Sequence, residues 1–449
     1  MSNRNKFIIG INGIDNTGKS TLVDLVNQNL SQLDEDIVYV PPHFSKLTDY
    51  FPERESDVVD WLKNAPREQV VRGILDGSVK RNSLIQVSEK PYILLDRGYF
   101  SILASSMARL DNHRGGINRV LSLAAETGFE NEGELSFLLE CSLPNSDMIS
   151  LLEGRNNFSF EEDYTEYLTR FRDYLSEIFP KDGKRLDLLG SPQQLASQVF
   201  DSLNENTDLK YRLALHDFLR EIQADTNIRT ILLTGSLSTN SVQIGWSDID
   251  LLCITHIESD RTDSLLKDRA NSVKRQYDID ITPWIVNYYD INNAVRKQGK
   301  IRYVLFDKSE TKCVYGTNDY SGVVSQGLVS ELSLDDASRL FEAGNVRLEE
   351  YKKRTLPLSK LYIKNLKMCF NVVKSVLLGE GLFCPTYQDI YIEAKKKYPK
   401  YDFEYLSNLI EQKLNFGEIT NQEMTSNIER QIGFSNNFLK YIKKKEESK

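Results

Sequence analysis

The stretch Gly13-Ile14-Asp15-Asn16-Thr17-Gly18-Lys19-Ser20 decides the fold of the first part of this chain. It satisfies the pattern GxxxxGK[ST], whose glycines let the backbone wrap around a phosphate with several N–H groups pointing inward. The apolar run Phe7–Ile11 precedes it, and a helix is expected to begin near Ser20. Strand, glycine loop and helix together predict a P-loop that binds ATP at a helix N-terminus.

Each side chain of this loop has an expected task. Lys19 should reach the terminal phosphates of ATP, and the Ser20 hydroxyl should ligate Mg²⁺. The expected nucleotide-binding residues of this loop are Gly13, Asp15, Asn16, Thr17, Gly18, Lys19, Ser20 and Thr21.

Further apolar runs predict the sheet to which this loop belongs. Strands are expected at Ile37–Val40, Tyr92–Leu95, Phe137–Cys141 and Arg185–Leu189, separated by longer helical stretches. That alternation is typical of a parallel sheet with flanking helices, so the predicted fold class is α/β over residues 1–205. The polar run 204–208 is the expected boundary of this domain.

Asp96 and Arg97 close the expected strand Tyr92–Leu95. Catalytic and ligand-binding residues of parallel sheets gather at the carboxyl ends of the strands. We therefore expect Asp96 to help hold Mg²⁺ and Arg97 to clamp the phosphate of an acceptor. Ser101, five positions after Asp96, completes a D-R-x-x-x-S unit.

Over residues 7–203 this arrangement resembles the thymidylate kinases, which carry a similar unit after a central strand. The resemblance implies phosphorylation of a (deoxy)nucleoside monophosphate, with dTMP as the acceptor, and also a homodimer. It implies that Asp15 contacts the acceptor sugar. Pro41-Pro42 stands where the family has a proline-containing substrate loop, and 158–163 is similar to the family's lid.

The resemblance also assigns the catalytic arginine. Some thymidylate kinases place it in the P-loop and others in the lid. Here Asn16 occupies the loop position, so Arg155, at the start of the lid segment, is expected to supply the positive charge on the migrating phosphoryl group. The chain departs from the family at Pro41-Pro42 and in 72–82, where Arg72 and Arg81 only weakly replace an acidic–arginine pair. These departures fall on the acceptor side.

A second motif begins after the expected strand Thr230–Thr234. Gly235-Ser236 should hold phosphates, and Ser247-Asp248-Ile249-Asp250 follows. Because side chains alternate along a strand, Asp248 and Asp250 should share one face and bind two metal ions for attack on an α-phosphate. A third carboxylate is expected from a strand at 277–281, with Asp280 preferred over Asp278.

This second motif resembles the DNA polymerase beta-like nucleotidyltransferases, chiefly the minimal and antibiotic-modifying members. It implies an α+β domain over residues 209–328 that transfers a nucleotide from an NTP and uses Mg²⁺. Its acceptor stays open between a tRNA and a small molecule. From residue 329 to 449 apolar residues recur at helical spacing, so an all-α bundle should follow. Lys360, Lys364 and Lys367 could reach a triphosphate, although such lysines more often face water.

Composition narrows the class of protein. The chain has 449 residues, 40% hydrophobic and 27% charged, with a net charge of -9, which argues against broad non-specific nucleic-acid binding. Five dispersed cysteines indicate reduced thiols rather than disulfides or a zinc site. The apolar run near the N-terminus is too short for a signal peptide and no run would span a membrane, so a cytoplasmic location is expected.

Two functions remain in view. The first is a bifunctional enzyme, in which a nucleoside monophosphate kinase is fused to a nucleotidyltransferase and makes a compound that the transferase extends. The alternative is a toxin or defence effector whose transferase modifies tRNA or protein, with the kinase domain as a nucleotide sensor.

Overall fold

The computed structural model describes residues 6–34, 37–52, 61, 64–110, 115–156, 161–181, 183–242, 244, 247–307, 311–317, 320, 323–353, 356–414 and 419–447. The chain divides between Lys210 and Tyr211 into two compact units. None of the helices in these ranges is long and apolar enough to cross a membrane.

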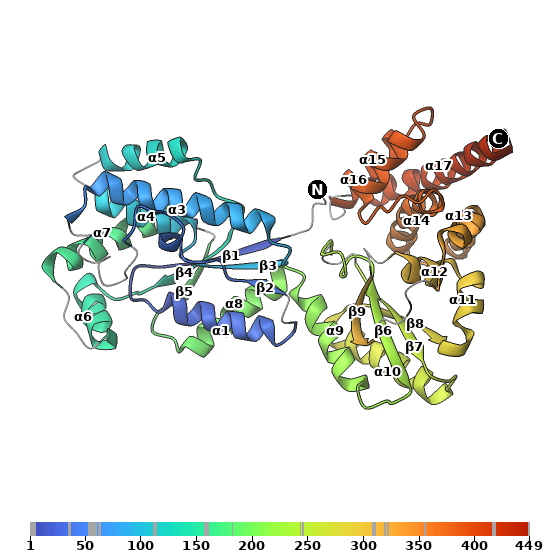
Figure 1. Ribbon diagram of the computed structural model, residues 1–449, viewed down its shortest axis with the longest axis horizontal. Helices are drawn as coiled ribbons and strands as arrows, with labels where there is room; N and C mark the ends of the chain where they lie inside the picture. Colours follow the sequence, from blue (N-terminus) through green and yellow to red (C-terminus); the bar gives the residue numbers. More distant parts are fainter. Residues whose placement is uncertain are drawn as a thin grey trace. The chain divides into compact units, whose positions relative to one another are not determined.

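The N-terminal unit is built on a five-stranded parallel sheet of order β2-β3-β1-β4-β5 (Figure 1). Its strands are β1 (Phe7–Asn12), β2 (Val38–Tyr39), β3 (Tyr92–Asp96), β4 (Leu135–Glu140) and β5 (Lys184–Asp187). The parallel α/β sheet expected from the sequence is thus present. The central strands are apolar on both faces because helices cover both sides of the sheet.

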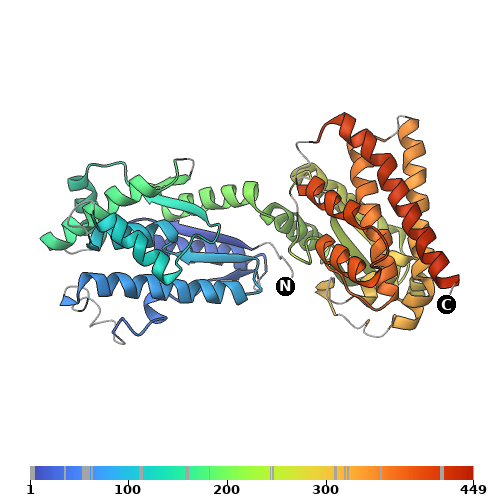
Figure 2. The ribbon, with the colours of Figure 1, turned by 90° about the horizontal axis from the view of Figure 1, so that it is seen from above.

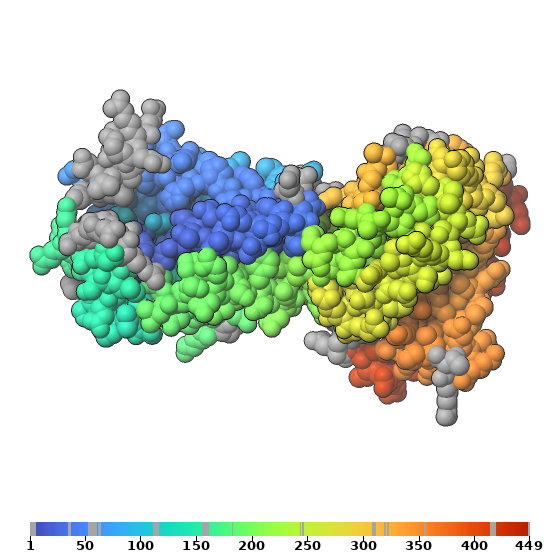
Figure 3. All heavy atoms as spheres, turned by 90° about the horizontal axis from the view of Figure 1, so that it is seen from below, coloured from blue at the N-terminus to red at the C-terminus, as the bar shows by residue number. Residues whose placement is uncertain are grey.

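Helices form a layer on each side of this sheet. One layer holds α1 (Lys19–Ser31) and α8 (Pro192–Asn206), which pack side by side (Figure 3). The other holds α3 (Arg67–Val87), α4 (Tyr99–Leu110) and α7 (Glu162–Ile178), with α5 (Gly115–Thr127) packed on α3 and α4. The unit also contains the 3-10 helix η1 (Phe44–Lys46) and α6 (Asn145–Asn156).

The expected boundary run 204–208 is not a loop. Helix α8 continues to Asn206, and Thr207 and Asp208 are buried, where both meet the hydroxyl of Tyr92. Helix α9 (Leu209–Ile222) then begins at once. Local polarity indicated a boundary here, and the two units divide close by, after Lys210, although Thr207 and Asp208 are hydrogen-bonded inside the first unit.

The C-terminal unit contains a four-stranded mixed sheet of order β8-β7-β6-β9. The strands are β6 (Ile228–Thr234), β7 (Ile249–Thr255), β8 (Ile281–Asn287) and β9 (Thr311–Gly316). Strand β7 runs parallel to β8, whereas β6 is antiparallel to β7 and β9. Helices α9 and α10 (Asp260–Tyr277) cover one face, and α11 (Ile291–Lys297) and α12 (Gly299–Phe306) cover the other.

The strand expected at 277–281 was wrong. Helix α10 extends through Tyr277, Asp278 ends it in the left-handed conformation, and β8 starts only at Ile281. The alternating run from Tyr277 to Ile281 imitates a strand, but its first residue belongs to the last turn of an amphipathic helix.

From residue 329 onward, where an all-α bundle was expected, the described residues form helices. The helices there are α13 (Gln326–Lys352), α14 (Leu358–Gly379), α15 (Tyr387–Lys397), α16 (Glu404–Leu414) and α17 (Asn421–Glu447). Helices α13, α14 and α17 pack together as long neighbours (Figure 2). The buried face of α14 forms the centre of the bundle core.

Candidate functional site

The glycine loop lies between β1 and α1, as the sequence predicts. Gly18 precedes the helix in the left-handed conformation, with φ 85°, and Asn16 is also left-handed, with φ 64°. Asparagine tolerates that backbone better than most side chains, so its presence in the loop has a conformational reason. Gly13 is fixed from outside the loop because its N–H donates to Ser101 Oγ at 2.9 Å.

Lys19 and Ser20 begin α1 directly after the glycine loop. Lys19 is 5% exposed, and its ammonium donates to the carbonyl of Ile14 at 2.5 Å. Burial, together with the charge of Arg97, lowers the pKa of Lys19 to about 8. The Ser20 hydroxyl donates to Asp96 Oδ2 at 2.5 Å, which joins the loop to the end of β3.

The second carboxylate oxygen of Asp96, Oδ1, indicates whether a metal ion fits at this position. Asp96 Oδ1 is buried and has no hydrogen-bond partner among the described residues. An orphaned carboxylate oxygen beside a serine hydroxyl is a suitable hard-oxygen ligand pair for Mg²⁺. The residues present therefore fit the ion that the sequence analysis expected.

Arg97 adopts a left-handed backbone with φ 64°, which is uncommon for a long side chain. The buried Arg81 side chain donates to the carbonyls of Asp96 and Arg97, and the Arg97 N–H donates to Ile11. These bonds hold the strained backbone and turn the Arg97 guanidinium toward Asp15, 2.6 Å away. Burial alone would raise the pKa of Asp15, but Arg97, Lys19 and Arg109 hold that pKa below its ordinary value.

A cavity of about 800 Å³ brings these residues together. Because β2 and β5 are opposite edges of the sheet and β1 is central, the segments after β2 and β5 lie on opposite sides of the glycine loop. On the β5 side the cavity is lined by Leu188, Pro192 and Leu195, which are largely apolar. On the β2 and β3 side it is lined by polar groups: His43, Asp96 and Arg97.

Several participants were not found from the sequence. Glu134 anchors the loop by accepting from the Asn12 amide at 3.0 Å and from the Tyr99 N–H at 2.8 Å. Tyr164 lines the cavity, and its hydroxyl accepts a hydrogen bond from the Asn16 amide at 3.2 Å. Glu134 lies 122 residues from its partner Asn12, and no local pattern marks either it or Tyr164.

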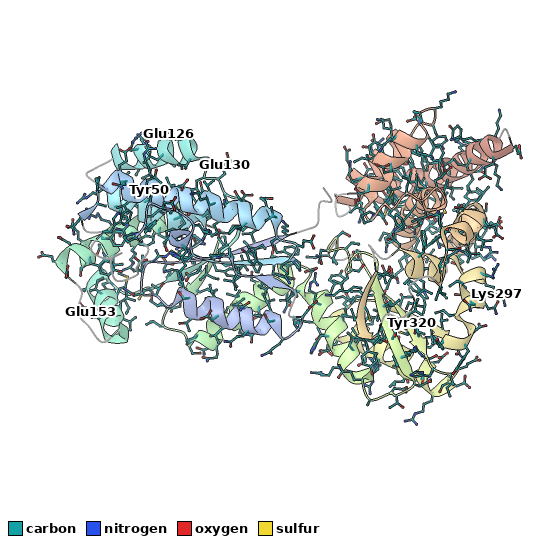
Figure 4. The ribbon with its side chains drawn as sticks, in the orientation of Figure 1. Tyr50, Glu126, Glu130, Glu153, Lys297 and Tyr320 are labelled. Atoms are coloured by element: carbon teal, nitrogen blue, oxygen red, sulfur yellow. The ribbon has the colours of Figure 1, made fainter. Side chains whose placement is uncertain are left out.

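Two arginines expected at the site from the sequence, Arg72 and Arg155, are not among the described residues that line the cavity. Arg72 lies away from the cavity lining, in a surface network with Glu68, Glu126 and Arg119; Figure 4 labels Glu126 on α5. The side chain of Arg155 and residues 158–160 of the expected lid fall outside the described part of the chain. The role of Arg155 therefore stays a prediction.

The second motif also forms a turn beside two carboxylates. Gly235 is left-handed, with φ 81°, and a side chain there would come within 3.2 Å of Asp250 Oδ2. Asp250 shares a sheet face with Leu252 and Ile254, which pack toward α11 and α12. Ser236 follows in the turn but does not line the adjacent cavity; its carbonyl accepts from the Ser241 N–H.

Each carboxylate is paired with a lysine from the helical part of this unit. Lys367 of α14 lies 2.9 Å from Asp248 Oδ1, and Lys300 of α12 lies 3.3 Å from Asp250 Oδ1. Lys300 also sits 3.2 Å above the ring of Trp284. The pKa of Asp248 is lowered because Lys367 outweighs burial, whereas burial and the neighbouring Asp248 raise the pKa of Asp250.

A cavity of about 520 Å³ opens between these carboxylates and the helices. It is lined by Asp248 and Asp250 and by the basic residues Lys297, Lys300, Arg339, Lys367 and Lys374. Lys297, labelled in Figure 4, ends α11. Of the three α14 lysines considered from the sequence, only Lys367 reaches the cavity lining.

The third carboxylate is not assembled at this cavity. The register of β7 and β8 places Asp280 beside Asp248, but its carboxylate pairs with Lys274 at 2.5 Å and is 57% exposed. Asp278 caps α10 instead. Among the described residues no cluster of three His, Cys, Asp or Glu side chains could hold a metal ion. Asp248 and Asp250 alone fit the expected metal ligands.

No family model matches the chain, and no curated protein matches it. Among solved structures, a thymidylate kinase from Candida albicans is 18% identical over 46% of this chain and 94% of its own, with a TM-score of 0.35. A deoxyadenosine kinase from M. mycoides is 14% identical over 44% of this chain and 100% of its own, with a TM-score of 0.32. At these scores neither likeness establishes an activity for this chain.

Proposed function

We propose that the N-terminal unit transfers the γ-phosphoryl group of ATP to a (deoxy)nucleoside monophosphate, with dTMP as the first acceptor to test. The observation that carries this proposal is the single cavity in which Lys19, Ser20 and Asp96 meet between an apolar side and a polar side. The apolar side formed by Leu188, Pro192 and Leu195 suits a purine base. The polar side suits an acceptor phosphate.

The reaction follows from these positions. An oxygen of the acceptor phosphate attacks the γ-phosphorus, a new O–P bond forms, and the bond from that phosphorus to the β-phosphate oxygen breaks to leave ADP. The loop N–H groups and Lys19 hold the phosphates in line, and Arg97 holds the acceptor. Mg²⁺ held by Ser20 and Asp96 would neutralise the charge on the β- and γ-phosphates.

A product screen tests this proposal. Purified protein with Mg²⁺ and ATP is incubated with each natural nucleoside monophosphate, and products are separated by chromatography with mass detection. We expect one monophosphate to give its diphosphate, with the rate falling at least about 100-fold in Lys19→Ala. Lys80→Ala, which changes an exposed lysine paired with Asp76 on α3, is the matched control and should keep full activity. No diphosphate from any monophosphate would overturn the proposal.

We also propose that the C-terminal unit is a metal-dependent nucleotidyltransferase. The supporting observation is the cavity lined by Asp248, which precedes β7, and by Asp250 within β7, together with Lys300 and Lys367. An acceptor oxygen would attack the α-phosphate of an NTP, forming an O–P bond while the bond to the departing pyrophosphate breaks. Lys300 and Lys367 are placed to pair with the triphosphate, and divalent cations on the two aspartates would stabilise the attacked phosphate.

The test uses NTPs labelled at the α-phosphate, with total tRNA, protein and the kinase products as separate acceptors. Transfer of label that disappears in Asp250→Asn supports the proposal, whereas label transfer unchanged in that variant contradicts it. The variant Asp280→Asn tests whether Asp280 acts as the third metal-binding carboxylate. A loss comparable with that of Asp250→Asn would show that Asp280 leaves Lys274 during the reaction.

A further inference from the structure

His43 is a half-buried polar group in the kinase cavity that the P-loop chemistry leaves unexplained. It follows the short edge strand β2 and lines the cavity together with Asp96 and Arg97. The charges that influence it are those of Arg97, Asp96, Arg81 and Asp15, so its ring lies within electrostatic reach of the acceptor side. The glycine loop and its lysine do not need this residue.

The orientation of the ring is fixed by its own segment. His43 caps the 3-10 helix η1, and its Nδ1 accepts from the Ser45 N–H at 3.4 Å and lies 2.8 Å from Ser45 Oγ. An Nδ1 that accepts from a backbone N–H carries no proton in the neutral ring, so the proton resides on Nε2. The ring edge not engaged by Ser45 therefore offers one N–H donor.

Tight packing keeps this segment in place. A side chain at Gly77 of α3 would overlap the carbonyl oxygen of Phe44, and one at Gly73 would press on Tyr50 (labelled in Figure 4). The rings of His43 and Phe44 lie 4.0 Å apart between centroids. Burial, reinforced by Arg97, lowers the pKa of His43 to about 4, so the ring is neutral near pH 7.

We propose that His43 binds the acceptor's monophosphate, with Nε2–H donating to a non-bridging oxygen beside Arg97; this rests on the proposed kinase function. The charge of Arg97 is already shared with Asp15 at 2.6 Å. A neutral N–H donor orients the phosphate through a directional hydrogen bond and adds no positive charge. The attacking phosphate oxygen therefore stays nucleophilic. Ser45 is then the positioning residue that fixes the tautomer.

Steady-state kinetics on the full-length protein test the role. His43→Phe removes the donor and should raise the KM for the monophosphate about tenfold, while the KM for ATP stays within about twofold of wild type. His43→Gln, whose amide can place an N–H near Nε2, should recover most of the loss. His216→Gln in the other unit is the matched control. An acceptor KM unchanged in His43→Phe, or an ATP KM that rises in parallel, would overturn the assignment.

Calorimetry of dTMP and the other monophosphates in the presence of ADP separates this inference from the kinase proposal, because binding needs no turnover. Binding that weakens in His43→Phe supports the inference even if wild type forms no diphosphate. Diphosphate formation with binding unaffected in His43→Phe leaves the kinase proposal standing and rejects the inference. A wild-type protein that neither binds nor phosphorylates any monophosphate rejects both.

Discussion

Lys19 shows how a functional residue can lower stability. The residue is 5% exposed, and burial together with the charge of Arg97 lowers its pKa to about 8 from an ordinary 10.5. A group whose folded pKa is depressed binds its proton more weakly in the folded state. The cost to folding is therefore complete below pH 8, and it disappears as the pH rises from 8 to 10.5.

Lys19→Met should consequently stabilise the protein while abolishing kinase activity. We expect its free energy of unfolding at pH 7 to exceed that of wild type by roughly 1–3 kcal/mol, with the difference shrinking above pH 8. Thermal melting of both proteins from pH 7 to pH 10 measures this, and Lys80→Met is the control. A variant that melts lower than wild type at pH 7 would mean that the bond to Ile14 outweighs the cost of burial.

Lys367 occupies the place of a counter-cation at the second site. Because it pairs with Asp248 at 2.9 Å, any divalent ion must compete with its ammonium. Lys367→Met removes a positive charge that partly neutralises the carboxylates of Asp248 and Asp250. The variant should therefore bind Mn²⁺ several-fold more tightly than wild type. Titration of Mn²⁺ followed by electron paramagnetic resonance measures it on the protein without nucleotide.

Two further variants make the Mn²⁺ experiment specific. Lys364→Met, one turn away on α14 and outside the cavity lining, should bind Mn²⁺ like wild type. The gain should also vanish when Asp248→Asn is added to Lys367→Met. A gain that survives Asp248→Asn would mean that Asp248 does not hold the ion, which would contradict the prediction.

At the scale of elements, the contact between α3 and η1 positions the acceptor side of the kinase cavity. Gly77→Ala should favour the helix by about 1 kcal/mol from propensity alone. However, the new methyl group would overlap the backbone carbonyl of Phe44, which cannot rotate away as a side chain could. We expect steric overlap to prevail, with a loss of roughly 1–3 kcal/mol in stability and a raised KM for the acceptor.

Denaturant unfolding and the two KM values measure this outcome. Gly433→Ala on α17 is the matched control because nothing lies near an added methyl group there, so the helix propensity should appear as a gain. A Gly77→Ala protein that is more stable than wild type would show that η1 moves freely, and would weaken the role given to His43.

Element boundaries show what the sequence could and could not predict. Strand β1 was expected at Phe7–Ile11 and β6 at Thr230–Thr234, because each apolar run ends at a motif whose chemistry requires a turn. Strand β8 was misplaced because Tyr277 completes the apolar face of α10. Strand β9 was not predicted at all, since only its pairing with β6 distinguishes it from loop.

At the scale of the whole molecule, the contiguous halves of both sites were predictable and their distant partners were not. The spacing of the motifs is enough to identify residues 13–20, Asp96, Asp248 and Asp250. In the structure, 15–20 and Asp96 line the first cavity, and Asp248 and Asp250 line the second. Tyr164, His43 and Lys300 line these cavities from segments whose sequence shows no motif. Their roles depend on tertiary proximity, which periodicity and spacing do not encode.

Each cavity lies wholly within one unit, the first within 5–210 and the second within 211–449. If the kinase product feeds the transferase, it must leave the first cavity before it enters the second. We therefore expect Lys19→Met and Asp250→Asn proteins each to fail alone in converting a monophosphate to the final product, and to recover conversion when mixed. Chromatography with mass detection follows the diphosphate and the final product.

The mixing experiment distinguishes free diffusion from direct transfer. Recovery should grow with the concentration of either variant, because the intermediate travels through solution, and added diphosphate should make Lys19→Met sufficient by itself. A mixture that stays inactive while wild type converts the monophosphate would indicate transfer within one chain. A Lys19→Met protein that converts the monophosphate unaided would show that the transferase does not depend on the kinase, which would remove the basis for coupling the two reactions.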